Sequence, residues 1–303
     1  MTLHHVVESQ QFTVPLLAEL FERAREMEKI VARGGTRDYD DKIMASLFYE
    51  PSTRTRFSFE AAMFRLGGRV LSTEQARHFS SEVDGEQLED TIRILGGYSD
   101  VIVLRHPDAG GAARAAAVSA VPVVNAGDGN GGQHPTQALL DLYTIHRARG
   151  TLDGLTIAMI GELDRGRTVR SLAYLLSKFD RVKIHFVSPP EVGMQPDILE
   201  HLEKHGTWYE QQSDLASIAG VVDVVYQTRI RPDRVRGHVL GRYSIDATTV
   251  RRMKPDAIIL HPLPRTVELD RTVDDDPRAR YFQQATNGLY VRMALLTMVW
   301  EQE

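Results

Sequence analysis

Residues 43–60 read IMASLFYEPSTRTRFSFE, and this stretch contains a complete strand-to-helix unit of an α/β fold. The apolar run Ile43–Phe48 is typical of a buried strand, and apolar residues at helical spacing follow over Phe57–Leu66. Between them the chain turns through a cluster of hydroxyl and arginine side chains. In α/β sheets, ligands bind beyond the carboxyl ends of the strands, so this turn is the first place to look for function.

Strand and helix patterns alternate along the rest of the chain. Seven further apolar runs are expected to form strands: Arg69–Leu71, Val101–Leu104, Val121–Val124, Leu155–Ile160, Val182–Val187, Val221–Tyr226 and Ala257–Leu260. The spacing of apolar residues predicts helices over Gln87–Gly96, Ala112–Ser119, Thr136–Arg147, Thr168–Phe179, Pro196–His205 and Gly288–Gln302. Apolar strands separated by helices are typical of parallel sheets that are covered on both faces.

The fold class that this order predicts is α/β, with two doubly wound parallel-sheet domains joined by helices. A length of 303 residues agrees with two domains at roughly 150 residues each. The glycine-rich stretch Asn125–Gln133 precedes a helix that begins near Pro135, and we place the boundary there. We expect a first domain of residues 1–134 plus 287–303, to which the C-terminal helix returns, and a second domain of residues 135–286.

Composition excludes several classes of protein. Apolar residues make up 42% and charged residues 25% of the chain, which excludes a disordered chain and a fibre. Cysteine is absent, which excludes disulfides and thiolate metal sites. No apolar run reaches the roughly 18 residues that span a bilayer, and the first residues lack a secretory pattern, so we expect a cytoplasmic protein without a membrane partner. The net charge of −5 argues against nucleic acid as a partner.

The turn at residues 52–55 has the chemistry of an anion site. Free backbone N–H groups at the start of a helix attract anions. Ser52, Thr53 and Thr55 add hydroxyl donors, and the guanidinium of Arg54 matches the oxygens of a phosphate. The alternative is an ordinary N-cap, but a cap needs only one hydroxyl. The cluster as a whole therefore favours phosphate binding.

Polar side chains also follow other predicted strands. They are Arg105, then His134 and Gln137 at the start of a helix, then Arg167, Arg229 and Arg231, and finally the proline-flanked segment with Leu263 and Pro264. The imidazole of His134 is suited to proton transfer or to donating to an oxyanion. The prolines favour a segment that offers carbonyl oxygens to a ligand amide, and the Leu263–Pro264 bond is a candidate cis bond. Arginines gathered at strand ends of an acidic chain predict a small ligand with several negative charges.

The segment Gly161–Thr168 leaves a second interpretation open. It nearly matches the phosphate-binding loop G-x-x-x-x-G-K-[ST], with Arg167 in place of the lysine. Such a loop would indicate a nucleotide hydrolase. No second strand end offers an obvious acid for Mg²⁺, and this disfavours the hydrolase.

Together these residues resemble the catalytic chain of the aspartate/ornithine transcarbamylase family over essentially the whole length. The matching motifs are FYEPSTRTRFSFE at 48–60, RHP at 105–107, NAGDG at 125–129, QHPTQALLDL at 133–142, GRT at 166–168, TR at 228–229 and HPLPR at 261–265. The Ser-Thr-Arg-Thr motif is typical of transcarbamylases as a class. The His-Pro-Leu-Pro motif is typical of their aspartate branch.

The resemblance implies that a carbamoyl group passes from carbamoyl phosphate to an amine without a metal or a cofactor. It implies that the phosphate is held by Ser52, Thr53, Arg54 and Thr55, and that the carbonyl oxygen is polarised by Thr55, Arg105 and His134. It also implies that the carbamoyl NH₂ meets Gln137 and the carbonyls of Leu263 and Pro264, and that Arg167 and Arg229 bind the acceptor. The family forms trimers with shared active sites, so we expect a homotrimer.

Two positions depart from the family's pattern. The loop that a neighbouring chain inserts into the site reads Ser-x-x-Lys-Lys-Gly-Glu in the family, whereas here Asp84, four residues after Ser80, replaces the lysine that touches phosphate and aspartate. Arg231 replaces a glutamine on the acceptor side, and we count it among the acceptor-binding residues. A carboxylate about 5 Å from a ligand carboxylate costs about 3 kcal/mol at an effective dielectric of 20. These charge changes predict an acceptor amino acid other than ordinary L-aspartate.

Two alternatives stay open. The first is a genuine aspartate carbamoyltransferase of pyrimidine biosynthesis, in which the loop stays outside the site or its acids pair with Arg231. The second is a non-catalytic paralogue that assembles with an active enzyme. The intact Arg54, Arg105, His134 and Gln137 argue against the paralogue.

Overall fold

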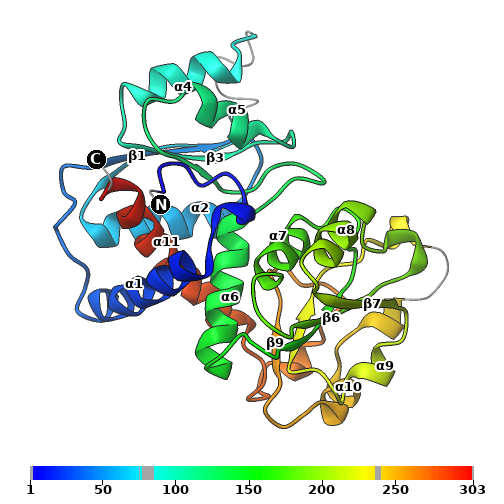
Figure 1. The fold of residues 1–303 in the computed structure, drawn as a ribbon. Coiled ribbons are helices and arrows are strands. Elements are labelled where there is room, and N and C mark those ends of the chain that lie inside the picture. The colour runs from blue at the N-terminus through cyan, green and yellow to red at the C-terminus, as the bar shows by residue number, and fades with distance from the viewer. Residues whose placement is uncertain (1–2, 75, 77–84, 236–239, 302–303) are drawn as a thin grey trace. The chain divides into compact units, whose positions relative to one another are not determined.

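Two parallel sheets organise the chain, one in each of two units, as the computed structural model shows for residues 3–74, 76, 85–235 and 240–301 (Figure 1). Unit 1 comprises Met1–Leu139 and Thr286–Glu303, and unit 2 comprises Leu140–Ala285. Every pair of neighbouring strands is parallel, and helices flank both sheets. The predicted α/β class with two parallel sheets is therefore confirmed, and so is the return of the C-terminal helix to the first unit.

The sheet of unit 1 has the strand order β2-β1-β3-β4. Its strands are β1 (Ile43–Phe48), β2 (Arg69–Glu74), β3 (Val101–Arg105) and β4 (Val123–Asn125). Its helices are α1 (Val14–Ala32), α2 (Thr53–Leu66), α4 (Leu88–Gly96), α5 (Gly111–Val118) and the ends of α6 (Pro135–Arg149) and α11 (Tyr281–Trp300) that fall in this unit. Helices α4 and α5 cover one face of the sheet (Figure 1), where Ala45, Leu47 and Leu104 pack against Ile92 and Ala115.

The sheet of unit 2 has the strand order β7-β6-β5-β8-β9. Its strands are β5 (Thr156–Ile160), β6 (Lys183–Val187), β7 (Trp208–Gln212), β8 (Val224–Gln227) and β9 (Ile258–Leu260). Its helices are α7 (Arg167–Leu176), α8 (Pro196–Lys204), α9 (Leu215–Ile218) and α10 (Ala247–Arg252), with short 3₁₀ turns that include η4 (Pro232–Arg234). On one face Ile160 and Val225 pack with Leu215 of α9 and Val250 of α10, which closes the core there.

Four of the described helices and strands were not predicted from the sequence: helices α1, α9 and α10 and strand β7. Strand β7 lies at the edge of its sheet and reads WYEQQ, with mostly exposed or half-exposed side chains, so it lacks the apolar run of a buried strand. Helix α1 buries Leu17, Leu20, Phe21 and Ala24 at helical spacing, a pattern that the sequence does contain. The C-terminal helix also begins at Tyr281, seven residues before the predicted start.

Parallel pairing places each unit's strand-end loops at one edge of its sheet. In unit 1 these are the loops that follow β1, β3 and β4, and in unit 2 the loops that follow β5, β8 and β9. All the candidate residues that the structure describes lie in these loops or at the helix starts that follow them. The strand order therefore gathers the polar residues of each unit, as expected for parallel sheets.

Candidate active site

The turn after β1 lies beside the end of β3. Phe48 is the register partner of Arg105, and the N–H of Tyr49 donates to the carbonyl of Arg105 over 2.9 Å. The chain then enters α2, with Ser52 at the N-cap position. The turn at residues 52–55 and Arg105 are thus brought together by the pairing of two neighbouring strands.

The hydroxyl of Ser52 does not cap α2, which removes the ordinary structural explanation for a serine at this position. Thr55 is buried in the first turn of the helix, Thr53 is exposed, and Arg54 is partly covered by the protein but still open to solvent. Partial burial lowers the pKa of Arg54 below its ordinary value, although an arginine keeps its charge at any physiological pH. Hydroxyls, helix N-terminus and arginine together form a site that can bind a phosphate.

A carboxylate from the neighbouring strand also reaches this turn. The N–H of Ser52 donates to Oε1 of Glu74 over 3.2 Å, and Nη2 of Arg56 lies 3.1 Å from Oε2 of the same carboxylate. Nη1 of Arg56 lies 3.5 Å from Glu60, one helical turn further on. Arg56 is therefore held by acids within the protein, in contrast to the role expected for Arg54.

Arg105 is nearly buried, and its guanidinium meets a second acid from the turn after β1. Nη2 of Arg105 lies 3.2 Å from Oε2 of Glu50, and the arginine side chain is 11% exposed. The acid orients the guanidinium at the strand end. A ligand oxygen that approaches Nη2 of Arg105 would have to compete with Glu50 for this donor.

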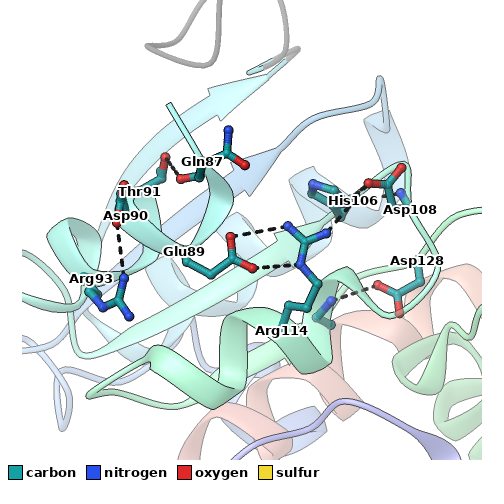
Figure 2. A network of polar contacts seen from close by, with 10 residues as sticks. Gln87, Glu89, Asp90, Thr91, Arg93, His106, Asp108, Arg114 and Asp128 are labelled. Atoms are coloured by element: carbon teal, nitrogen blue, oxygen red, sulfur yellow. Dashed lines mark hydrogen bonds and ion pairs between the residues drawn. The ribbon is translucent and has the colours of Figure 1, made fainter. Parts of the chain in front are cut away.

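The residues after Arg105 fix the direction of this loop (Figure 2). Nδ1 of His106 accepts a hydrogen bond from the N–H of Asp108 over 3.1 Å, and its ring meets the edge of Tyr49. The buried carboxylate of Asp128 accepts the N–H groups of Gly110 and Ala112 at the start of α5. A negative group at a helix N-terminus stabilises that helix, so Asp128 anchors the loop that carries Arg105.

His134 and Gln137 lie at the start of α6, as predicted. His134 is 4% exposed, and its carbonyl accepts the N–H groups of Gln137 and Ala138 in the first turn. Nδ1 of His134 lies 3.4 Å from Oγ1 of Thr136. Gln137 is half-buried. Both residues belong to unit 1, with Ser52, Thr53, Arg54, Thr55 and Arg105.

In unit 2 the ends of β5 and β8 approach each other closely at Gly161. A Cβ atom at this residue would lie 2.2 Å from Oγ1 of Thr228, and its φ of +128° belongs to the region that favours glycine. The hydroxyl of Thr228 donates to the carbonyl of Ile160 over 2.8 Å. This contact holds the loop that leads to Arg167 beside the loop that carries Arg229.

Arg167 and Arg229 both lie at this edge of the sheet. Arg167 is the first residue of α7 and is half-buried, and Arg229 follows β8 and is exposed. The carbonyl of Arg229 accepts the N–H of Glu162 over 3.2 Å, which links the two loops through the backbone. Two guanidinium groups from adjacent loops provide the donors that a ligand with two carboxylates requires.

Arg231 is directed at an acid of the protein. Its Nη2 lies 2.8 Å from Oε1 of Glu162 and its Nε 3.2 Å from Oε2. Arg234 also reaches Glu162, over 2.9 Å, and Asp164, over 2.5 Å. Burial raises the pKa of Glu162, but Arg231 and Arg234 outweigh this and lower it below the ordinary value. Because Glu162 already pairs with Arg231, the assignment of Arg231 to the acceptor finds no support in this geometry.

The segment after β9 has an unusual backbone. The Leu263–Pro264 bond is cis, in agreement with the prediction, and Leu263 has a φ of +55°. The next residue, Arg265, forms a two-pronged ion pair with Asp274. The predicted neighbour-chain residues Ser80 and Asp84 lie outside the described residues.

Acids that pair with the site arginines were missed in the sequence. Glu50 and Glu162 each follow a strand by two residues and pair with Arg105 and Arg231. An acid at a strand end, next to a loop rich in arginine, was the signal that could have found them.

Among residues 3–74, 76, 85–235 and 240–301, no group of three or more His, Asp or Glu side chains could hold a metal ion. Within the same ranges, no helix has the length and apolar character needed to cross a membrane.

Comparison with known protein families gives two matches that divide the chain. Residues 4–147 match the aspartate/ornithine carbamoyltransferase, carbamoyl-P binding domain. Residues 153–299 match the aspartate/ornithine carbamoyltransferase, Asp/Orn binding domain. A relative from Oryza sativa subsp. japonica, the chloroplastic aspartate carbamoyltransferase, is 53% identical over 311 residues that cover 99% of this chain and 85% of the relative.

Solved structures agree with the sequence matches. The catalytic subunit of M. jannaschii aspartate transcarbamoylase has a TM-score of 0.92 and 44% identity, and the similarity covers 99% of each chain. Aspartate transcarbamoylase from Trypanosoma cruzi, solved in complex with carbamoyl aspartate and phosphate, has a TM-score of 0.91 and 40% identity. That similarity covers 98% of this chain and 96% of the other.

Proposed function

Because this chain belongs to the aspartate/ornithine carbamoyltransferase family, we propose that it transfers the carbamoyl group of carbamoyl phosphate to the amine of L-aspartate. The single observation that carries this proposal is the 53% identity to an aspartate carbamoyltransferase across both domains. That identity agrees with the His-Pro-Leu-Pro motif at residues 261–264, which leans to the aspartate branch.

L-Aspartate replaces the acceptor that we expected from the sequence. The expectation of a different amino acid rested on Arg231 and Asp84. Arg231 is paired with Glu162 within the protein, so its charge gives no argument for a new acceptor. Asp84 lies outside the described residues. The relative and the solved structures described above are all aspartate carbamoyltransferases, which favours L-aspartate as the acceptor.

The proposed reaction forms one bond and breaks one. The unprotonated amine of aspartate attacks the carbonyl carbon of carbamoyl phosphate, and the C–O bond to the phosphate then breaks. The attacking nitrogen loses one proton, which the departing phosphate accepts, and the products are carbamoyl aspartate and inorganic phosphate. Negative charge develops on the carbonyl oxygen, so donors preorganised around that oxygen lower the barrier.

The residues of unit 1 would bind the donor. Ser52, Thr53, Arg54 and Thr55 supply hydroxyls, backbone N–H groups and a guanidinium for the phosphate, consistent with the N-terminus of α2. Thr55, Arg105 and His134 would stabilise the carbonyl oxygen, and Gln137 would receive the carbamoyl NH₂. Each removed donor of this kind lowers kcat by about 10²–10³.

The residues of unit 2 would bind the acceptor and complete recognition of the donor. Arg167 and Arg229 would each bind a carboxylate of aspartate, with charge-assisted hydrogen bonds of about 1.5–3 kcal/mol each. The carbonyls of Leu263 and Pro264 would accept hydrogen bonds from the carbamoyl NH₂. This assignment follows the family resemblance residue by residue.

The proposal is tested by assaying carbamoyl transfer against a panel of amines with the purified full-length chain. We expect L-aspartate to be carbamoylated at rates typical of enzymes, and L-ornithine at least about 100-fold more slowly, because its side-chain ammonium would meet arginines. Faster carbamoyl transfer to another amine than to L-aspartate would instead support the hypothesis of a different acceptor. Binding of carbamoyl phosphate without transfer to any amine would favour a non-catalytic paralogue.

We further propose that the chain forms a homotrimer, in which Ser80 and Asp84 of one chain contribute to the site of its neighbour. The support is the family resemblance alone. Light scattering should give three copies of the 34.0 kDa chain per particle. The proposed location is the cytoplasm, which fractionation of the source cells would test.

A further inference from the structure

Two buried acids of unit 2 take no part in the proposed reaction. Glu268 is 3% exposed, and Asp141 is fully buried. Burying a carboxylate is costly unless hydrogen bonds satisfy it, so each needs partners that justify its position. Their hydrogen bonds lead from both of them to one place, the segment after β9 that contains Leu263 and Pro264.

The first set of bonds fixes His261 and Leu263. The N–H of Leu263 donates to Nδ1 of His261 over 2.8 Å. A neutral imidazole that accepts at Nδ1 carries its hydrogen on Nε2, and this atom lies 3.0 Å from Oε1 of Glu268. Leu263 has a φ of +55°, which is uncommon for leucine and persists only where the surroundings enforce it. The bond to His261 is part of that enforcement.

The second set of bonds ties the other end of the segment to the same carboxylate. Glu268 accepts the N–H of Thr266 over 2.8 Å and its hydroxyl over 2.5 Å. Burial raises the pKa of Glu268, but the bonds from His261 and Thr266 lower it to about 2. The carbonyl of Glu268 accepts the N–H of Ile245 over 2.9 Å. A single ionised carboxylate thus spans residues 261–266 and is itself anchored.

The third set anchors the start of the segment in the core. The N–H of His261 donates to Oε1 of Gln284 over 2.9 Å, and Nε2 of Gln284 donates to Oδ1 of Asp141 over 2.6 Å. The hydroxyl of Tyr226 donates to Oδ2 of Asp141 over 2.7 Å. Burial and the charge of Asp141 raise the pKa of Tyr226 well above its ordinary value, so the phenol remains a donor.

We propose that His261, Glu268 and Gln284 are positioning residues that hold the carbonyls of Leu263 and Pro264 where they recognise the NH₂ group of carbamoyl phosphate. Through this loop they would determine the specificity for a carbamoyl donor over other acyl phosphates. The inference rests on the proposed function, which assigns these two carbonyls to the carbamoyl NH₂. It adds the side chains that hold them, none of which touches the substrate.

Acetyl phosphate is the probe that isolates this recognition. It has the size and charge of carbamoyl phosphate, but a methyl group replaces the NH₂. A methyl group offers these carbonyl oxygens no hydrogen bond, and a site that recognises an NH₂ group in this way rejects an analogue that lacks it. A less rigid loop should therefore bind carbamoyl phosphate more weakly, whereas the binding of acetyl phosphate should hardly change.

Two variants differ in severity. Glu268→Gln removes the charge and puts a donor where only acceptors fit. Thr266→Val removes one hydroxyl at an exposed position and is expected to fold normally. The dissociation constants of both acyl phosphates are measured by titration calorimetry, which requires no turnover. We expect the preference for carbamoyl phosphate to fall about tenfold or more in Glu268→Gln and about threefold in Thr266→Val.

Asp223→Asn is the matched control. This carboxylate also lies in unit 2 and accepts from the N–H of Thr156, Arg149 and Lys254, but it directly precedes β8, at the opposite end of that strand from Arg229. The Asp223→Asn variant should lower the stability of the chain and leave its preference for carbamoyl phosphate over acetyl phosphate unchanged.

If folded Glu268→Gln and Thr266→Val bind both acyl phosphates equally more weakly than wild type, the positioning role is overturned. If wild-type chain prefers carbamoyl phosphate but carbamoylates no aspartate, the proposed acceptor fails and the positioning role stands.

Discussion

Arg231 and Glu162 form a two-pronged ion pair, with Nη2 2.8 Å from Oε1 and Nε 3.2 Å from Oε2. The pair joins the loop after β8 to the loop after β5, and Arg234 adds a third contact to the same carboxylate. The extra arginine of this chain is thus balanced within the protein. The ion pair of Arg231 with Glu162 therefore strengthens the contact between the ends of β5 and β8.

The first prediction follows from this pairing. We expect Arg231→Gln to raise the KM for aspartate by less than about threefold, because the charge of Arg231 already meets Glu162. Arg229→Gln is the comparison, and we expect it to raise that KM by about 10- to 100-fold through the loss of charged hydrogen bonds. Steady-state kinetics with aspartate varied would measure both. An equally large effect in the two variants would make Arg231 an aspartate ligand.

The second prediction concerns the phosphate site. Arg54→Ala should lower kcat by about 10²–10³, the effect of removing one transition-state donor. Arg56→Ala is the control, since Arg56 is held by Glu74 and Glu60 and should matter for stability alone. Turnover of carbamoyl phosphate with saturating aspartate provides the measurement. An unchanged kcat in Arg54→Ala would remove this arginine from the site.

The third prediction concerns the loop of the neighbouring chain. Asp84→Lys should raise kcat/KM for aspartate by at least about tenfold, because a repulsion of about 3 kcal/mol between carboxylates becomes an attraction. The gain should shrink as salt is added, since the interaction is electrostatic. Initial rates at low aspartate and two ionic strengths would show it. No gain at either would mean that the loop stays out of the site.

The fourth prediction is a pH dependence of stability. The pKa of Glu268 is about 2 in the folded chain, below the ordinary value of 4.5 that applies when the chain is unfolded. Its contribution is therefore fully present above pH 4.5 and is lost as the pH falls toward 2, by at most about 3 kcal/mol. Glu268→Gln should be less stable at pH 7 and should show a flatter decline below pH 4.5 in urea unfolding. Parallel curves for wild type and variant would contradict this linkage.

The fifth prediction tests the close contact at Gly161. Gly161→Ala should destabilise the folded chain by about 2–4 kcal/mol, because a Cβ atom would lie 2.2 Å from Oγ1 of Thr228 and φ is +128°. Gly154→Ala is the matched control, with a φ of +72° and nothing within 4 Å. It should cost about 1 kcal/mol from the backbone alone. The difference between the two in thermal unfolding measures the packing contact.

The sequence predicted those parts of the fold that rest on local patterns. Buried strands such as Ile157–Ile160 are apolar runs, and longer helices such as α7 repeat apolar residues at helical spacing, so both were found. The short helices α9 and α10 were not found. Strand β7 was not predicted, because an edge strand needs no apolar run and is defined by its pairing with β6. Pairing joins distant residues, and a local pattern does not contain it.

The candidate site was predictable as a set of residue types at strand ends. Parallel topology places the strand ends at one edge of the sheet, and the pairing of β1 with β3 brings Arg105 beside the turn of Ser52. The side chains that form ion pairs with those residues could not be predicted from the sequence. Whether Arg231 meets a ligand or Glu162 depends on loop geometry within a few ångströms, and no spacing rule specifies that.

The contact between Gly161 and Thr228 has a consequence for how such a protein can diverge. Two loops that leave their strands in direct contact cannot shift independently at that point. New specificity in descendants of this chain would have to arise by exchange of side chains at fixed backbone positions. The pairing of Arg231 with Glu162 is an example, because it changes the charge at the strand end through side chains alone.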